Sequence, residues 1–197
     1  MVQRSRGPSE LLGGPFLGSA AVEAGLVTAG QLRSARWVRV FRDVYLHRDL
    51  RLTPRRKAQA AMLIAPANAA VGGRLAACLH GVNLLRDGDP AELVVPVGTM
   101  IRQRDGLLVR QATIAPDDLV EVRGVPVLTP LRVAFDLARS EPDPAAAAVI
   151  VNALSRSRRR VNHFDPPALL SYALRHPGAR GVRHLPQVVA YSFIPSP

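Results

Sequence analysis

The segment from residue 18 to residue 46 constrains the fold most, because it specifies a helix, a turn and a second helix in close succession. Ser19 is placed to cap a short helix, and Gly25 suits the left-handed backbone that commonly follows a helix C-terminus. Thr28 is placed to cap a second helix, which we expect to continue to about Arg36. The apolar side chains expected to meet between these helices are Val22, Leu26 and Leu32.

Two short stretches rich in β-forming residues follow, from Trp37 to Val40 and from Asp43 to His47. The two residues between them, Phe41 and Arg42, fit the tight turn of a β-hairpin. Two short helices followed by a hairpin are the layout of a winged helix-turn-helix, a module whose second helix enters the major groove of DNA. The sequence therefore predicts a DNA-binding domain over residues 15–50, with double-stranded DNA as its partner.

Polar and basic side chains occupy the second expected helix and the hairpin. We expect the side chains of the second helix to face the groove and those of the hairpin to hold phosphates. The candidate DNA-binding residues are Thr28, Gln31, Arg33, Arg36, Arg39 and Arg42. The arginines recur every three residues, a spacing that shares a face in a helix but not in a strand, so the four cannot all contact the same phosphates. A pair of ordinary helices with solvated arginines is the alternative interpretation.

The charge distribution favours a polyanionic partner. The formal net charge is +11. Residues 1–60 carry eleven basic side chains against four acidic ones, residues 61–140 eight against eight, and residues 141–197 seven against three. Positive charge concentrated in this way favours nucleic acid, because each neutralised phosphate releases condensed counterions. The run from Arg156 through Arg158, Arg159 and Arg160 is either a second phosphate contact or a charged helix end.

Composition points away from several protein classes. The longest apolar runs are far shorter than the roughly 20 residues that span a bilayer, and no secretory signal is recognisable at the start. Cys78 is the single cysteine, which excludes an internal disulfide and a cysteine-based zinc site. We expect a soluble, cytoplasmic protein without a membrane partner.

No enzymatic constellation is recognisable in the sequence. It lacks a glycine-rich phosphate loop, a Gly-x-Ser-x-Gly elbow and an HExxH motif. His80 ends an expected helix, where a histidine more often packs or caps than binds a metal. The acid pair Asp117-Asp118 follows Pro116 and is expected in a turn. We therefore predict no catalytic activity, no metal site and no cofactor.

The rest of the chain predicts an α+β domain over residues 53–190 that ends in helices. Thr53 and Pro54 begin a helix, and short strands are expected at 69–71, 92–97, 106–111, 119–123 and 126–128. Helices are then expected at 129–139, 144–156, 166–175 and 178–189. Strands followed by a run of helices favour an α+β fold over a repeated βαβ fold.

Five segments, in this order, carry a resemblance to a known family: GLVTAGQLRSARWVRVFRDVYL, GGRLAACLHGV, ELVVPVG, RGVPVLTPLRVAFDLAR and HPGARGVRHL. They span roughly residues 18–185 and resemble the AbiEi antitoxins of type IV toxin–antitoxin systems, in their actinobacterial form. The resemblance implies an N-terminal winged helix-turn-helix that binds operator repeats near its own promoter. It also implies an α+β domain that aids repression and antagonises a nucleotidyltransferase toxin without a tight complex.

This sequence departs from the family pattern in three respects. Relatives often have an arginine where this chain has Ala29, and serines where it has Gly72 and Leu75. Many similar proteins continue into a restriction-like endonuclease domain with acidic metal ligands, which this sequence lacks, so nuclease activity is not expected. Operator repeats imply two protomers per site, although the sequence displays no dimer seam.

The main hypothesis is a DNA-binding transcriptional regulator that represses its own operon and antagonises a nucleotidyltransferase toxin. A second hypothesis is a non-catalytic DNA-targeting remnant of a protein once fused to an endonuclease. A third is a pure interaction module whose α+β part binds another protein. A neighbouring toxin gene would favour the first hypothesis over the second.

Overall fold

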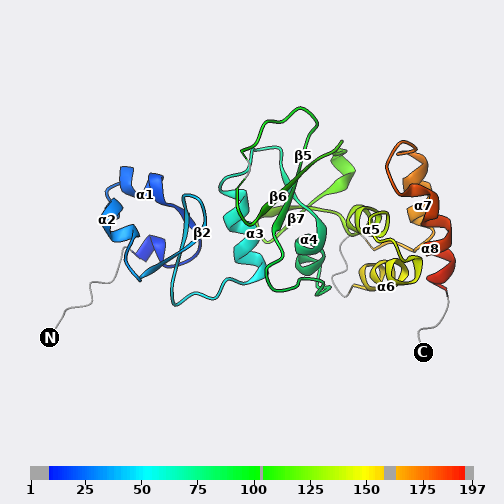
Figure 1. Cartoon of the computed structure of the whole chain (residues 1–197), viewed down its shortest axis with the longest axis horizontal. Coiled ribbons are helices and arrows are strands. Elements are labelled where there is room, and N and C mark those ends of the chain that lie inside the picture. Colours follow the sequence, from blue (N-terminus) through cyan, green and yellow to red (C-terminus); the bar gives the residue numbers. More distant parts are fainter. Residues whose placement is uncertain (1–8, 103, 158–162, 194–197) are drawn as a thin grey trace. The chain divides into compact units, whose positions relative to one another are not determined.

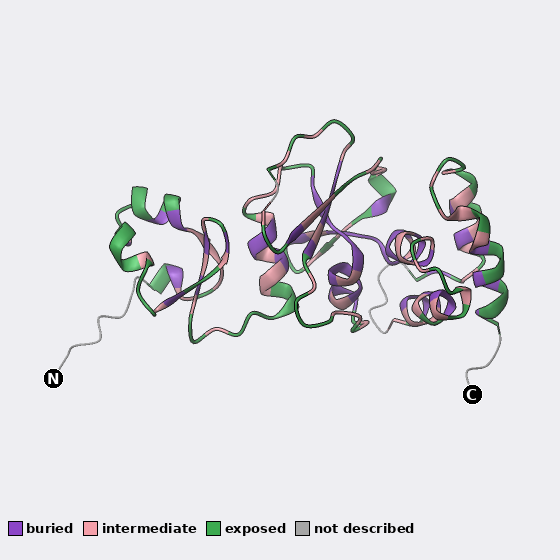
Figure 2. Cartoon of the chain, in the orientation of Figure 1, coloured by how far each residue is buried: buried purple, intermediate pink, exposed green. Residues whose placement is uncertain are grey.

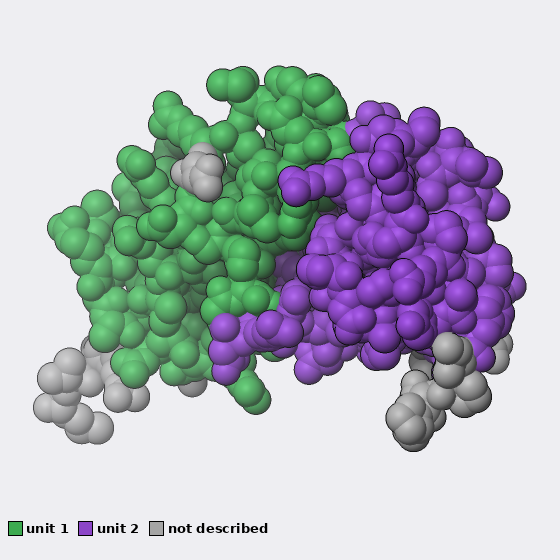
Figure 3. Space-filling model, turned by 45° about the vertical axis from the view of Figure 1, so that its right-hand side comes forward, with its two compact units in different colours: residues 1–69, 88–112 green, residues 70–87, 113–197 purple. Residues whose placement is uncertain are grey.

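The computed structural model describes residues 9–102, 104–157 and 163–193 (Figure 1). The chain divides into two compact units, residues 1–69 with 88–112 and residues 70–87 with 113–197, coloured separately in Figure 3. The protein is of the mixed α+β class, as predicted. No helix within the described ranges combines the length and apolarity needed to cross a bilayer.

The first unit opens with short elements that surround a small aromatic core. They are η1 (Ser9–Leu11), β1 (Phe16–Leu17), α1 (Gly18–Glu23), α2 (Ala29–Leu32), β2 (Trp37–Phe41) and β3 (Val44–His47). β3 lies between β1 and β2 and pairs antiparallel with both. The buried Trp37 ring meets Phe16 edge-on, with centroids 5.0 Å apart. This cluster holds the two short helices against the sheet.

Three local predictions for this segment are wrong. Helix α2 ends at Leu32 rather than near Arg36, because the Arg36 carbonyl accepts the Arg48 N–H (2.8 Å) and is thereby drawn to the sheet. The hairpin turns at Arg42-Asp43, since Phe41 is buried and Asp43 tolerates the left-handed φ of 68°. Val22 is exposed, and the smaller Ala21 fills the core instead.

The rest of the first unit is a helix and two parallel strands. Helix α3 (Pro54–Met62) begins as predicted, with the Thr53 hydroxyl accepting the Arg56 N–H (3.3 Å). Strands β5 (Ala91–Val95) and β6 (Leu107–Gln111) pair in parallel, and α3 packs against β5 and β2. The sequence indicated both strands but not their parallel pairing.

The second unit places helices beside a small mixed sheet, and Figure 2 shows the buried residues of both. Most of these buried residues are aliphatic, with Phe135, Tyr172 and Arg132 among the exceptions. Its strands are β4 (Ala70–Val71), β7 (Leu119–Val122) and β8 (Val125–Leu128), with β8 parallel to β4 and antiparallel to β7. Its helices are α4 (Gly73–Leu79), η2 (Pro116–Asp118), α5 (Pro130–Ala138), α6 (Pro144–Ser155), α7 (Ala168–Leu174), η3 (Val182–His184) and α8 (Leu185–Tyr191). The single helix expected at 178–189 is instead divided, because Gly181 takes a left-handed φ of 86° and α8 begins only at Leu185.

Candidate nucleic-acid interface

Helix α2 is a single turn that its own side chains stabilise. The Thr28 hydroxyl accepts the Gln31 N–H (3.1 Å), and the Gln31 side-chain oxygen accepts the Thr28 N–H (2.7 Å). This reciprocal pair is a capping box, which satisfies two backbone donors that a helix start otherwise leaves unpaired. Thr28 therefore caps the helix, as predicted. Gln31 also caps the helix, a role that was not predicted from the sequence.

The four arginines of the candidate site retain free guanidinium groups. Arg33 follows α2 as its C-terminal cap, Arg36 precedes β2, Arg39 lies within β2, and Arg42 lies at the hairpin tip. All are exposed except Arg36, which is half-buried. Within residues 9–102, 104–157 and 163–193, none of these guanidinium groups forms a hydrogen bond or an ion pair. Their charges are thus available to an external anion.

An irregularity in the hairpin sets where two of these arginines lie. Arg39 pairs with Tyr45 across the strands, while Phe41 pairs with Val44, so the register shifts between Arg39 and Phe41. Such a bulge adds one residue on one strand and changes the faces to which the following side chains point. Arg39 and Arg42 therefore belong to different parts of the hairpin, its flank and its tip.

Asp43 attaches the hairpin tip to the start of α1. Its side chain accepts the Ser19 N–H (2.8 Å) and the Ser19 hydroxyl (2.5 Å), and its carbonyl accepts the Gly18 N–H (2.9 Å). Ser19 was expected to cap α1 itself, whereas the capping carboxylate comes from the hairpin. Asp43 was not predicted from the sequence, because a cap supplied from 24 positions away leaves no local signal.

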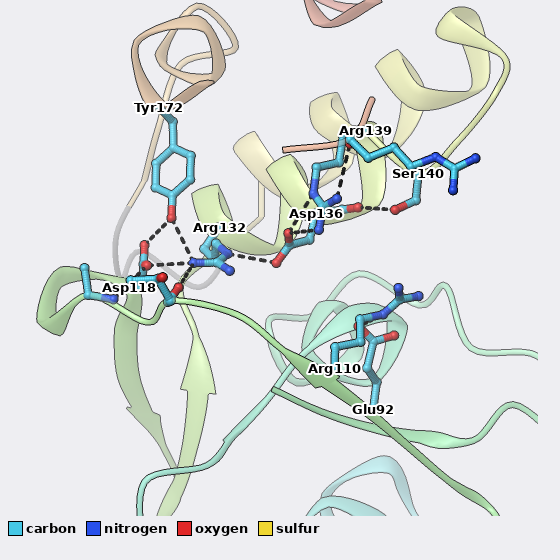
Figure 4. A network of polar contacts seen from close by, with 11 residues as sticks. Glu92, Arg110, Asp118, Arg132, Asp136, Arg139, Ser140 and Tyr172 are labelled. Atoms are coloured by element: carbon cyan, nitrogen blue, oxygen red, sulfur yellow. Dashed lines mark hydrogen bonds and ion pairs between the residues drawn. The ribbon is translucent and has the colours of Figure 1, made fainter. Parts of the chain in front are cut away.

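A buried polar network joins three elements of the second unit (Figure 4). The Arg132 guanidinium on α5 donates to Asp118 (2.8 Å), Asp136 (2.8 Å) and the Tyr172 hydroxyl (3.2 Å). The Tyr172 hydroxyl in turn donates to Asp118 (2.6 Å). Burial, followed by the hydrogen bond to Asp118, raises the pKa of the Tyr172 hydroxyl. Asp118, expected merely in a turn, is thus a buried ion-pair partner.

The side chains of this network satisfy one another's hydrogen-bonding groups. Among the described residues, no buried side-chain nitrogen or oxygen is left without a hydrogen bond, and no three potential metal ligands gather. The buried His80 Nε2 lies 2.7 Å from the Leu128 carbonyl, which agrees with the expected role of packing or capping. Arg158, Arg159 and Arg160 lie outside the described residues.

Comparison with known proteins identifies the second half of the chain. A model of the AbiEi antitoxin C-terminal domain matches residues 68–183, more than half of the sequence. The chain belongs to the AbiEi antitoxin family. Neither the curated proteins nor the solved structures compared with it include a match.

The AbiEi match begins at residue 68, just before β4, and includes the buried network of the second unit. Two of the departures from the family pattern lie in it. Leu75 is fully buried, so this position serves packing in the present chain. Gly72 precedes α4, which consequently begins without a side-chain cap. The segment with the free arginines, residues 28–42, precedes the matched region.

Proposed function

We propose that this AbiEi protein is a DNA-binding transcriptional regulator, and that residues 28–42 are its DNA-contacting surface within a winged helix-turn-helix. The observation that carries the proposal is the set of four unpaired guanidinium groups around a rigidly capped helical turn. A polyanion gains most from charges that need not break an existing ion pair first. The net positive charge of residues 1–60 supports the same conclusion.

The geometry of α2 limits how Gln31 could recognise a base. A bidentate contact with adenine uses both the oxygen and the nitrogen of the amide. The Gln31 oxygen already accepts the Thr28 N–H, which turns this end of the amide back to the helix start and leaves the NH₂ group as the freer end for DNA. We infer that Gln31 donates to a single acceptor, and that Arg33 and Arg36 contribute most of the sequence preference, since arginine binds guanine with two donors.

The antitoxin part of the proposal depends on the family. We propose that the protein is cytoplasmic and non-catalytic, represses its own operon and antagonises a nucleotidyltransferase toxin, as the AbiEi resemblance implies. Co-expression with a nucleotidyltransferase encoded beside the gene tests this role. Restored growth supports it, and continued growth arrest with both proteins present contradicts it.

A gel-shift titration with DNA from upstream of the gene tests the DNA-binding surface. Arg33→Ala and Arg36→Ala are each expected to weaken binding by about 1–3 kcal/mol if the arginine contacts a base. Arg183→Ala is a matched control, because Arg183 is exposed but belongs to the second unit. Equal affinities for all three variants would refute the assignment.

A further inference from the structure

Helix α6 exposes an apolar face. From Pro144 to Leu154 every residue except Asn152 is apolar. One side of the helix is buried, and α6 packs against α5 and α8. On the other side Ala145 is exposed, Val149 is 62% exposed, and Ala153, four residues further on, is half-buried. No charged side chain interrupts this face along the 12 residues of the helix.

Helix propensity does not explain the exposed valine. A helix that is hydrophobic all round is normally buried on all sides, and β-branched residues at exposed helix positions lose side-chain entropy without a packing gain. Asn152 does not make the face polar either, because its amide donates to the Ser192 carbonyl (3.1 Å) on the side of α8. Phe193, the residue after Ser192, is also a largely exposed apolar side chain, at 66%.

The two ends of α6 carry opposite charges. Glu141 and Asp143 precede the helix, and Arg156 follows it. Within the described part of the chain none of the three forms an ion pair. Asp143 accepts the Ala145 N–H (2.9 Å) as the helix cap. The helix is therefore negative at one end, apolar in the middle and positive at the other end.

We propose that the occupant of this face is α6 of a second copy of the chain, packed antiparallel about a twofold axis near Val149. Twofold packing requires a surface that complements itself. Here the face is symmetric about its centre: Val149 meets Val149, and Ala145 of each copy lies opposite Ala153 of the other. The small alanines allow close approach of the helices, and Arg156 of each copy reaches the carboxylates before the other helix.

The dimensions of α6 indicate a weak dimer. Its 12 residues span about 18 Å at 1.5 Å per residue. An interface centred on one such helix lies at the low end of the size range, below about 1,200 Å², where complexes are transient. The dimer should therefore appear at high protein concentration, and this association does not depend on DNA.

Sedimentation equilibrium of the whole chain without DNA tests the dimer. The weight-average mass of the wild type should rise with concentration from 21.2 kDa toward twice that value. Val149→Glu should remain at the monomer mass, whereas Leu174→Glu should behave like the wild type, because Leu174 is 81% exposed on α7 and outside the face. A wild type that stays monomeric at about millimolar concentration, or equal behaviour of the two variants, would overturn the proposal.

A charge-reversal series tests the antiparallel arrangement independently of Val149. Arg156→Glu and Glu141→Arg should each weaken the dimer several-fold, because like charges then meet at both ends of the helix pair. The double variant restores opposite charges and should recover the wild-type dissociation constant within about twofold. A double variant weaker than either single variant would overturn the antiparallel arrangement. Circular dichroism confirms that each variant is folded.

Discussion

Gly181 allows the segment before α8 to pack closely against the C-terminus of α5. A Cβ atom at this position would collide with the Arg139 carbonyl, and the φ of 86° is itself unfavourable for other residues. The neighbouring His184 Nε2–H donates to the Ala138 carbonyl (2.9 Å), and Arg139 donates to the Arg180 carbonyl (3.2 Å). The HPGARGVRHL segment thus contributes hydrogen bonds at the C-terminus of α5 through Arg180 and His184.

Gly181→Ala should therefore lower the free energy of unfolding by at least about 2 kcal/mol, since backbone strain and a steric clash both oppose the native conformation. Gly178→Ala is the control, because a Cβ there meets nothing within 4 Å and the backbone is not left-handed. Urea unfolding measures both. If Gly181→Ala is no less stable than Gly178→Ala, the capping account of this segment is wrong.

Tyr172 predicts a specific loss of stability in alkali. Its pKa is raised by burial and by the bond to Asp118, so the folded state keeps its proton above pH 10, where the unfolded state loses it. The tyrosine contribution is therefore complete below pH 10 and falls by about 1.4 kcal/mol per pH unit above it.

Tyr172→Phe isolates this contribution. At pH 8 the variant should be less stable than the wild type by about 1–3 kcal/mol, because Asp118 loses a buried partner. The difference should shrink as the pH rises above 10. A difference that stays constant from pH 8 to pH 11 would contradict the raised pKa.

Helices and strands were predictable where local residues specify them. Thr53 and Pro54 begin α3, and Gly25 ends the first helical turn with a φ of 69°, as the sequence indicated. Prediction failed where contacts with residues distant in the sequence determine where a helix or a turn ends. The Arg36 carbonyl accepts a hydrogen bond from Arg48 beside the sheet, and α2 ends before it. Burial of Phe41 moves the hairpin turn by one residue. The parallel pairing of β5 with β6 has no local signal at all.

In the candidate site, too, local contacts were predictable and distant ones were not. The sequence identified the Thr28 cap because the residues that form it are three positions apart. It did not identify Asp43, since the helix that Asp43 caps lies 24 positions earlier. The contacts of Arg33, Arg36, Arg39 and Arg42 with DNA stay predictions, which the spacing suggested and the free guanidinium groups support.

Asp43→Ala should remove the side-chain hydrogen bonds that join the hairpin tip to Ser19 of α1. The variant loses the cap of Ser19 and places alanine at a left-handed φ of 68°, so a loss of about 2 kcal/mol in the free energy of unfolding is expected. Asp49→Ala should change stability by less than about 0.5 kcal/mol, because its side chain is 80% exposed. Comparable thermal unfolding of the two variants would show that the Asp43 contacts are not stabilising.

For the whole molecule, the uneven charge predicts strongly salt-dependent association with DNA. If about five phosphates are neutralised, a fourfold rise in salt should weaken binding about 500-fold. Ala29, exposed at the start of α2, offers a gain-of-function test, because the family resemblance implies an arginine at this position. Ala29→Arg should tighten binding to DNA. If the new arginine neutralises one phosphate, the slope of log K against log salt should also rise in magnitude by about 0.9. An unchanged slope would place position 29 away from the DNA.

The most direct test of the DNA-binding surface is the slope of log K against log salt for DNA from upstream of the gene. Fluorescence anisotropy can measure it for the wild type, for Arg39→Ala/Arg42→Ala, which removes the two arginines proposed to hold phosphates, and for the control Arg183→Ala. The double variant should lose about 1.8 from the magnitude of the slope, or 0.9 for each lost phosphate neutralisation, while the control keeps the wild-type value. A double variant with the wild-type slope and affinity would contradict the proposed surface.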